Sequence, residues 1–289
     1  MTGAGGPMVM RRFTETALAF RPGRSAASWP ALLIFTVVFV YPVLRFVLTG
    51  IASLRAPSAL ADQASIIGYL IWNSVWLGLW TSLVCLLLGY PIAYYLARSP
   101  SRRKHYVTVA IFAPLLVSIV VRTFGWLVLL GSNGVLNDLL LRLDVIRAPV
   151  VWLYNFPVTV VGLVHVFLPF MVLSIVSSLT HIDRRVEEAA SMLGAHPWRV
   201  FYHVTLPLSA QGIFGGCAIV FSLTVGSYVT PRLLGGGRVQ VLSTEIYTQM
   251  LEIGDWGMAA VLGTVLTLVA FLVIAVYRVS FRTKRFANA

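Results

Sequence analysis

The sequence contains few charged residues for its length. Only 11% of its 289 residues are charged and 58% are hydrophobic, whereas about 25% are charged in an ordinary soluble domain. So few charged side chains cannot cover the surface of a water-soluble chain of this size. This composition excludes a soluble enzyme and a disordered tail, and it places most of the chain in lipid.

The residues that most enzymes need are also scarce. The two cysteines, Cys85 and Cys217, lie in apolar runs and form neither a disulfide framework nor a metal-ligand spacing. Neither of the two lysines, Lys104 and Lys284, follows a glycine loop, so a phosphate-binding P-loop is absent. Zinc-protease and serine-nucleophile motifs are absent as well. We therefore expect no catalytic residue, no metal site and no cofactor bound by this chain.

Acidic residues are missing from the apolar stretches. Proton- and sodium-coupled carriers usually need an ionisable or polar site near the middle of the membrane. The absence of acidic residues from the apolar stretches therefore argues against a self-powered carrier. All ten acids lie in predicted loops or tails: Glu15, Asp62, Asp138, Asp144, Asp183, Glu187, Glu188, Glu245, Glu252 and Asp255.

Six apolar stretches are long enough to cross a bilayer, which takes about 20 residues per helix. The chain is therefore predicted to be an all-α membrane protein with six transmembrane helices. The second stretch is overlong and contains Pro91, so a tilt or kink is expected there. The predicted spans are 29–49, 67–96, 107–130, 158–180, 208–228 and 256–279.

The net charge of +12 is scattered between the apolar runs, so it indicates topology and not a nucleic-acid partner. Fifteen Lys and Arg lie in the N-terminal segment, in the loops after spans two and four, and in the C-terminal tail; the opposite loops hold five. By the positive-inside rule, both termini are predicted to be cytoplasmic. The basic runs 98–104 and 278–285 are interpreted as anchors at anionic lipid.

The loop between spans four and five, residues 183–207, carries its own helix signals. Asp183 is a good N-cap residue, and Glu187 and Glu188 follow where negative charge favours a helix start. Gly194 suits the left-handed residue that ends such a helix. A second short helix is predicted to begin at Pro197.

Three small residues of this loop, Ala189, Ala190 and Gly194, form a face that another protein's backbone can approach closely. The segment from Glu188 to Pro207 resembles the E-A-A-x-x-x-G-x9-I-x-L-P loop of the membrane subunits of binding-protein-dependent ABC importers, with Val204 in place of the usual Ile. The resemblance implies the type I ABC importer permease fold in a bacterial inner membrane. In that family the loop forms a coupling helix that sits in a groove of the ATPase.

The resemblance covers most of residues 65–280, which are predicted to form the importer core. Composition, hydropathy and charge add a cytoplasmic arm at 1–28, a first transmembrane helix with its outer loop at 29–64 and a cytoplasmic tail at 281–289. Seven residues of the coupling loop are implied to contact the ATPase, although Glu187 and Glu188 also suit a helix start for its own sake. They are Glu187, Glu188, Ala189, Ala190, Gly194, Leu206 and Pro207.

Further stretches, such as Gly89 to Tyr94 and Gly226 to Pro231, resemble the spermidine/putrescine branch. The implied function is ATP-driven uptake of a polyamine; permeases for iron, sulfate, phosphonate or opines are the alternatives. The implied partners are a cytoplasmic ATPase that holds ATP and Mg, a second and different permease chain, an extracytoplasmic solute-binding protein, and membrane lipid. A membrane scaffold that transports nothing is the rival from another class.

Six residues are candidates for the substrate pathway. For most of them, hydrogen bonding between helices is the simpler interpretation. Arg122 is open between a pathway or gate residue and a side chain that reaches the headgroups. The candidates are Asn73, Arg122, Ser222, Thr224, Ser227 and Tyr228.

Overall fold

The structure is a computed structural model that describes residues 33–53 and 57–286. It divides into two compact units, Met1–Leu48 and Thr49–Ala289. The first contains the π-helix η1, Thr36–Val40, and the start of α2, Tyr41–Ser53. The predicted arm at 1–28 lies outside the described residues.

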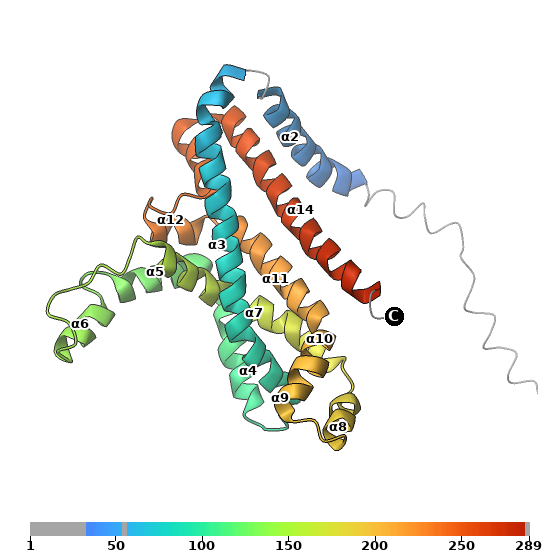
Figure 1. The fold of residues 1–289 in the computed structure, drawn as a ribbon. Helices are drawn as coiled ribbons and strands as arrows, with labels where there is room; N and C mark the ends of the chain where they lie inside the picture. Colours follow the sequence, from blue (N-terminus) through green and yellow to red (C-terminus); the bar gives the residue numbers. More distant parts are fainter. Residues whose placement is uncertain (1–32, 54–56, 287–289) are drawn as a thin grey trace, which may run out of the picture. The chain divides into compact units, whose positions relative to one another are not determined.

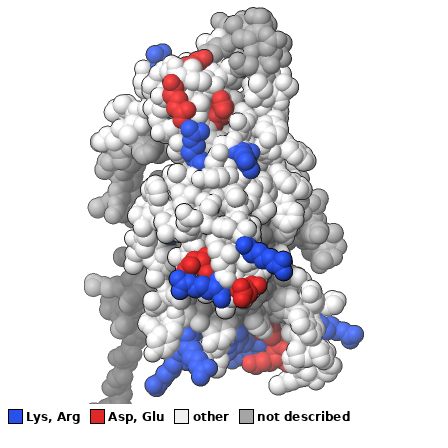
Figure 2. Space-filling view, turned by 90° about the vertical axis from the view of Figure 1, so that its left-hand side faces the viewer, with Lys and Arg blue, Asp and Glu red and all other residues white. Residues whose placement is uncertain are grey.

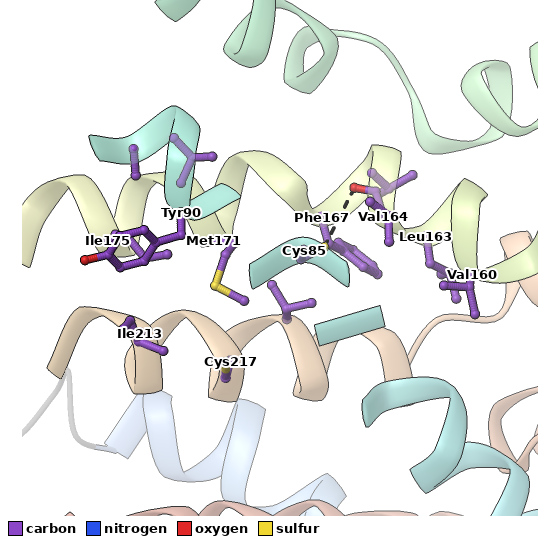
Figure 3. Packing of buried hydrophobic residues seen from close by; sticks show 14 of the residues in the cluster. Cys85, Tyr90, Val160, Leu163, Val164, Phe167, Met171, Ile175, Ile213 and Cys217 are labelled. Atoms are coloured by element: carbon purple, nitrogen blue, oxygen red, sulfur yellow. Dashed lines mark hydrogen bonds between the residues drawn. The ribbon is translucent and has the colours of Figure 1, made fainter. Parts of the chain in front are cut away.

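Three long helices form the core of the second unit. They are α3 (Pro57–Arg98), α7 (Phe156–Thr180) and α11 (Ala210–Val225), which pack against one another (Figure 1). Pro91 and Pro169 lie inside α3 and α7 without ending either helix. Figure 3 shows the shared core, in which Cys85 of α3 lies against α7 and its Sγ is 3.9 Å from the carbonyl oxygen of Val164.

Glycines let α11 lie directly against α7. Gly212 and Gly216 are four residues apart, so they share one face of α11. A Cβ at Gly212 would lie 2.8 Å from the backbone oxygen of Ser174, and one at Gly216 would lie 2.5 Å from the sulfur of Met171. Small residues at this spacing allow close helix packing in membranes. The Ser174 hydroxyl donates to the carbonyl of Gly212 at 2.8 Å.

The predicted span 107–130 is wrong as a single helix. The chain forms α4 (Lys104–Phe112), a 3₁₀ turn η2 (Ala113–Leu116) and then α5 (Ile119–Leu130). Pro114 suits the start of η2, and Val117 adopts an extended backbone with φ −96° and ψ 137°. The Ser118 hydroxyl then accepts from the amide of Val120 and opens α5.

The segment after α5 folds around one buried amide. A turn at 131–134 separates α5 from the short helix α6, Val135–Arg142. The Asn137 side chain donates to the carbonyl of Val150 and accepts from its amide, at 2.9 and 3.1 Å. It also accepts from the indole of Trp152 at 3.0 Å. These bonds hold the irregular residues 143–155 against α6.

The remaining elements complete the second unit. After α11 come α12 (Val229–Gly235), α13 (Leu242–Tyr247), the π-helix η4 (Thr248–Ile253) and the long α14 (Trp256–Phe286). The described residues contain five helices long and apolar enough to span a membrane, or six when Pro197–Leu208 and Ala210–Val225, which meet at 61°, count as one. The predicted fifth span, 208–228, is therefore one arm of a bent pair. Figure 2 shows the charged side chains of one face in separate groups with uncharged surface between them.

Replacing Gly212 with Ala should destabilise the core, because the neighbouring atoms include the backbone of Ser174 and Ile175, which cannot move aside cheaply. We expect a loss of about 1–3 kcal/mol, measured as a lower melting temperature of the detergent-purified protein. Gly68→Ala on α3 is the matched control, since a Cβ there meets no atom within 4 Å. Equal melting temperatures for the two variants would contradict this account of the α7–α11 contact.

Candidate functional site

The loop predicted from sequence at 183–207 begins with two short helices joined by a turn. The first, α8, covers Arg184–Met192, and the Asp183 side chain caps it by accepting from the amide of Arg185 at 3.0 Å. Gly194 adopts the left-handed conformation with φ +82°. The second, α9, covers Pro197–Val200 with the proline in its first turn. These local predictions are confirmed.

An ion pair ties α8 to the end of α3. Arg98 Nη2 lies 2.9 Å from Glu187 Oε1, and the two side chains are only 11% and 15% exposed. The same carboxylate oxygen accepts from the hydroxyl of buried Thr205 at 2.9 Å. Thr205 ends the π-helix η3, Phe201–Thr205. Glu187 therefore joins α8 to η3 and to the end of α3, which is 89 residues away in the sequence.

A second arginine, Arg184, connects α8 to the backbone at the end of α3. Arg184 of α8 donates through Nη2 to the carbonyls of Ala97 and Arg98, at 3.2 and 2.8 Å. Those carbonyls lie at the C-terminus of α3, where a helix leaves acceptors unpaired and where positive charge is favourable. Arg98 in turn donates to the carbonyl of Ile182 at 3.3 Å. We call this set of contacts among Arg98, Arg184, Glu187 and Thr205 the α3–α8 clamp.

Aromatic packing extends the connection along α3. The Phe201 ring meets those of Tyr90 and Tyr94 edge to face, with centroids 5.5 and 6.1 Å apart. The Tyr90 hydroxyl lies 2.9 Å from the hydroxyl of buried Ser209. Ser209 lies between the short α10, Leu206–Leu208, and α11. The loop and the residues after it therefore contact α3 at two places, at Arg98 through the clamp and at Tyr90 and Tyr94 through aromatic packing.

The other side of the loop faces outward. Glu188, Ala189, Gly194 and Pro207 are exposed, while Ala190 and Leu206 are half-buried. Large apolar side chains accompany them: Met192, Leu193 and Trp198 are 88%, 89% and 65% exposed. An apolar, small-residue surface on a helix held rigidly from behind can bind another protein. Of the two glutamates, only Glu188 points into this surface, since Glu187 is engaged in the α3–α8 clamp.

An open cavity of about 150 Å³ lies among α12, α13 and η4. Its lining includes Gln240, Glu245 and Glu252, and Arg232 pairs with Glu252 at 2.8 Å. The Asn73 amide donates to the carbonyl of Gln240 at 3.0 Å. Of the predicted pathway residues, Asn73 therefore has the direct connection to this cavity.

The other predicted pathway residues are spread over several contacts. The Ser222 hydroxyl donates to the carbonyl of Ala218 in its own helix at 2.8 Å. Thr224 and Ser227 are buried, and their hydroxyls have no hydrogen-bond partner among the described residues. Tyr228 stacks on Tyr247 with ring centroids 3.9 Å apart. The structure does not gather these residues around one site.

Residues 86–285 match the model of a family described as the binding-protein-dependent transport system inner membrane component. Over 216 residues the chain is 33% identical to the spermidine/putrescine transport system permease protein PotB of Escherichia coli K12, covering 75% of this chain and 78% of PotB. This chain belongs to that family. It is an ABC importer permease of the bacterial inner membrane, with several membrane-spanning helices.

Other relatives show how broad the family is. The permease is 31% identical to PotB of Haemophilus influenzae over 218 residues, 75% of each chain. It is 30% identical over 197 residues to the molybdenum transport system permease protein ModB of Azotobacter vinelandii, covering 67% of this chain and 85% of ModB. These relatives are transport proteins, which agrees with a transport subunit.

Solved structures confirm the importer fold. A chain of a bacterial ABC transporter that imports the acidic polysaccharide alginate superposes with a TM-score of 0.68 at 19% identity, over 90% of the permease and 95% of that chain. A chain of the MetNI methionine ABC transporter gives a TM-score of 0.56 at 14% identity, over 75% and 97%. The predicted type I importer permease fold is confirmed.

The sequence did not predict the contacts that hold the loop 183–207 against α3. Arg98 was interpreted as a lipid anchor within the basic run 98–104, and this is wrong for Arg98, whose guanidinium is bonded to Glu187 and Ile182. Thr205 and Tyr90 carried no functional prediction. The available signal was the position of Arg98 at the end of a long helix, but a partner 89 residues away cannot be read from spacing.

Replacing Glu187 with Gln should loosen the loop, because it removes the charge that accepts from Arg98 and Thr205. A hydrogen bond to a charged group contributes about 1.5–3 kcal/mol, so we expect trypsin to cut the loop at least about tenfold faster in the detergent-purified permease. The cleavage sites are Arg184, Arg185 and Arg199.

Glu188→Gln is the matched control, since its side chain is exposed, and its cleavage rate should stay unchanged. The clamp assignment is wrong if Glu187→Gln and Glu188→Gln are cut equally fast.

Proposed function

We propose that the permease is one of two different permease chains in an ATP-driven polyamine importer, with both termini in the cytoplasm. In this proposal the exposed side of α8 binds a cytoplasmic ATPase. The proposal rests on a difference between the two sides of the segment 183–207. One side is bonded to α3 through the α3–α8 clamp, and the other exposes Glu188, Ala189 and apolar side chains that a partner can contact.

The clamp suggests how force reaches the membrane helices. ATP and Mg are held by the ATPase pair, and closure of that pair displaces α8. Because α8 is covalently continuous with α7 and bonded to α3, both helices follow, and α11 follows through its glycine contact with α7. The two permeases then rock apart to open a pathway for solute from the binding protein, and ATP hydrolysis resets them. The permease itself makes and breaks no covalent bond.

Gly194→Trp tests the docking of the ATPase. A Cβ at Gly194 meets no atom within 4 Å, so the new side chain fits the permease but projects into the proposed interface. We expect solute uptake and co-purification of the ATPase to fall at least about tenfold, while membrane insertion stays normal.

Gly254→Trp controls for backbone strain, because Gly254 has the same φ of +82° and equally open surroundings. It should keep the ATPase bound. The docking proposal fails if the Gly194 variant still carries the ATPase and transports, or if both variants lose the ATPase alike.

The substrate proposal rests on the relatives. Two of them at 31–33% identity are named for spermidine and putrescine, and the ModB relative, named for molybdenum, is matched over a smaller share of this chain. A cationic solute also agrees with Glu245 beside the cavity of α12, α13 and η4, where the charge of Glu252 is already paired with Arg232. Iron, sulfate, phosphonate and opines are the other solutes that the family resemblance allows.

Proteoliposomes containing the complete importer and its binding protein test the substrate. We expect ATP-dependent uptake of labelled spermidine that excess putrescine suppresses and that sulfate or molybdate leaves unchanged. Asn73→Leu and Tyr228→Ala should alter uptake without loss of the complex, as expected for residues near the pathway. Uptake of an anion in place of spermidine overturns the polyamine proposal, and an intact complex without any transport favours a scaffold.

A further inference from the structure

The cavity among α12, α13 and η4 is lined by three charged side chains. Two are carboxylates, those of Glu245 and Glu252, and the third is the guanidinium of Arg232. The lining carboxylates therefore outnumber the lining cations, and the cavity carries a net negative charge. A hollow with this charge concentrates cations and repels anions.

The cavity is remote from the loop 183–207. Helix α11 starts just after that loop and runs for 16 residues, or about 24 Å, before α12 begins at Val229. Figure 1 shows α12 and α8 well apart along α3. Because the proposed function places the loop in the cytoplasm, it places the cavity toward the side from which the binding protein delivers solute.

The two carboxylates have different partners. Glu245 accepts from the side-chain amide of Gln249 at 2.8 Å, and this neutral partner leaves its charge in place. Glu252 is paired with Arg232 at 2.8 Å, and the two side chains are 45% and 41% exposed. Ion pairs open to water are weak, because water screens the attraction and two long side chains lose freedom. An arriving ammonium group can therefore replace the guanidinium at Glu252.

We propose that Arg232 is a tethered counter-ion that occupies the place of a solute ammonium group at Glu252 while the cavity is empty. One ammonium group of a polyamine binds at Glu245, and a second displaces the guanidinium from Glu252. Because Arg232 competes for this carboxylate, the cavity holds the polyamine weakly, which suits a site that a transported solute must leave again. This inference rests on the proposed function, since it requires a cationic solute.

Binding of labelled spermidine to the detergent-purified importer, without its binding protein, tests the exchange. Glu252→Gln removes the carboxylate and should weaken spermidine binding several-fold. Arg232→Gln removes the competing cation and should tighten the binding several-fold. An ion pair that only supports the fold predicts weaker or unchanged binding for both variants, so the opposite directions are the diagnostic result.

Two further variants show whether the effect of Arg232 acts through Glu252. In the double variant Arg232→Gln with Glu252→Gln, no carboxylate remains to be freed at position 252, so binding should be no tighter than with Glu252→Gln alone. Arg142→Gln is the matched control, since Arg142 forms an ion pair of the same length with Asp138 outside the cavity lining. It should leave spermidine binding unchanged.

Chemical modification gives a second readout on the unaltered importer. Phenylglyoxal reacts with arginine side chains, and a guanidinium released from its carboxylate is more accessible to the reagent. Spermidine should therefore increase the modification of Arg232, measured by peptide mass spectrometry, and leave that of Arg142 unchanged. A ligand that binds without the exchange protects Arg232 or does not affect it.

The outcomes separate two failures. If the importer neither binds nor transports spermidine, the proposed function itself fails. If spermidine is transported, two results overturn the exchange while the proposed function stands: an assembled Arg232→Gln importer that binds spermidine no more tightly than the unaltered one, or modification of Arg232 that spermidine does not increase.

Discussion

Hydrogen bonding of the backbone in lipid is the constraint on which this structure depends. Hydrocarbon offers no partner for an amide or a carbonyl, so the described spans are helices that satisfy these groups internally. Hydroxyls assist at several points: Ser74, Ser82 and Thr264 each donate to the carbonyl four residues earlier. The same constraint applies at the break at Val117, where some backbone amides and carbonyls have no helical partner and need hydrogen bonds from neighbouring groups.

Close packing then makes the three core helices one body. Lipid is as apolar as the side chains, so the hydrophobic effect does little to hold membrane helices together, and association relies on close contact. Gly212 and Gly216 supply that contact between α11 and α7. Ser74 adds a polar link by accepting from the amide of Leu242, which ties the first residue of α13 to α3. A rigid body of this kind can pass a displacement from one end to the other.

The α3–α8 clamp explains why two adjacent glutamates differ. Glu187 faces the helices and is used for positioning, whereas Glu188 faces outward beside Ala189. Packing resists compression, but an ion pair and hydrogen bonds also resist separation. Arg98 and Arg184 reach in opposite directions between α3 and α8, so these bonds resist separation of the two helices.

Composition and local patterns were sufficient to predict the lipid surroundings, the helical class, the family and the local form of the loop at 183–207. Composition and span length report burial in lipid directly, and the cap at Asp183 and the left-handed Gly194 depend on neighbouring residues alone. The three-dimensional arrangement was needed to show that Arg98 pairs with Glu187, that Asn73 donates to Gln240 and that one face of α5 is exposed and apolar. The two contacts join residues that are 89 and 167 positions apart. Local sequence patterns do not encode such pairings, nor do they show which face of a helix the rest of the chain leaves exposed. The third span was mispredicted because hydropathy measures transfer to lipid and does not register the backbone interruption that follows Pro114.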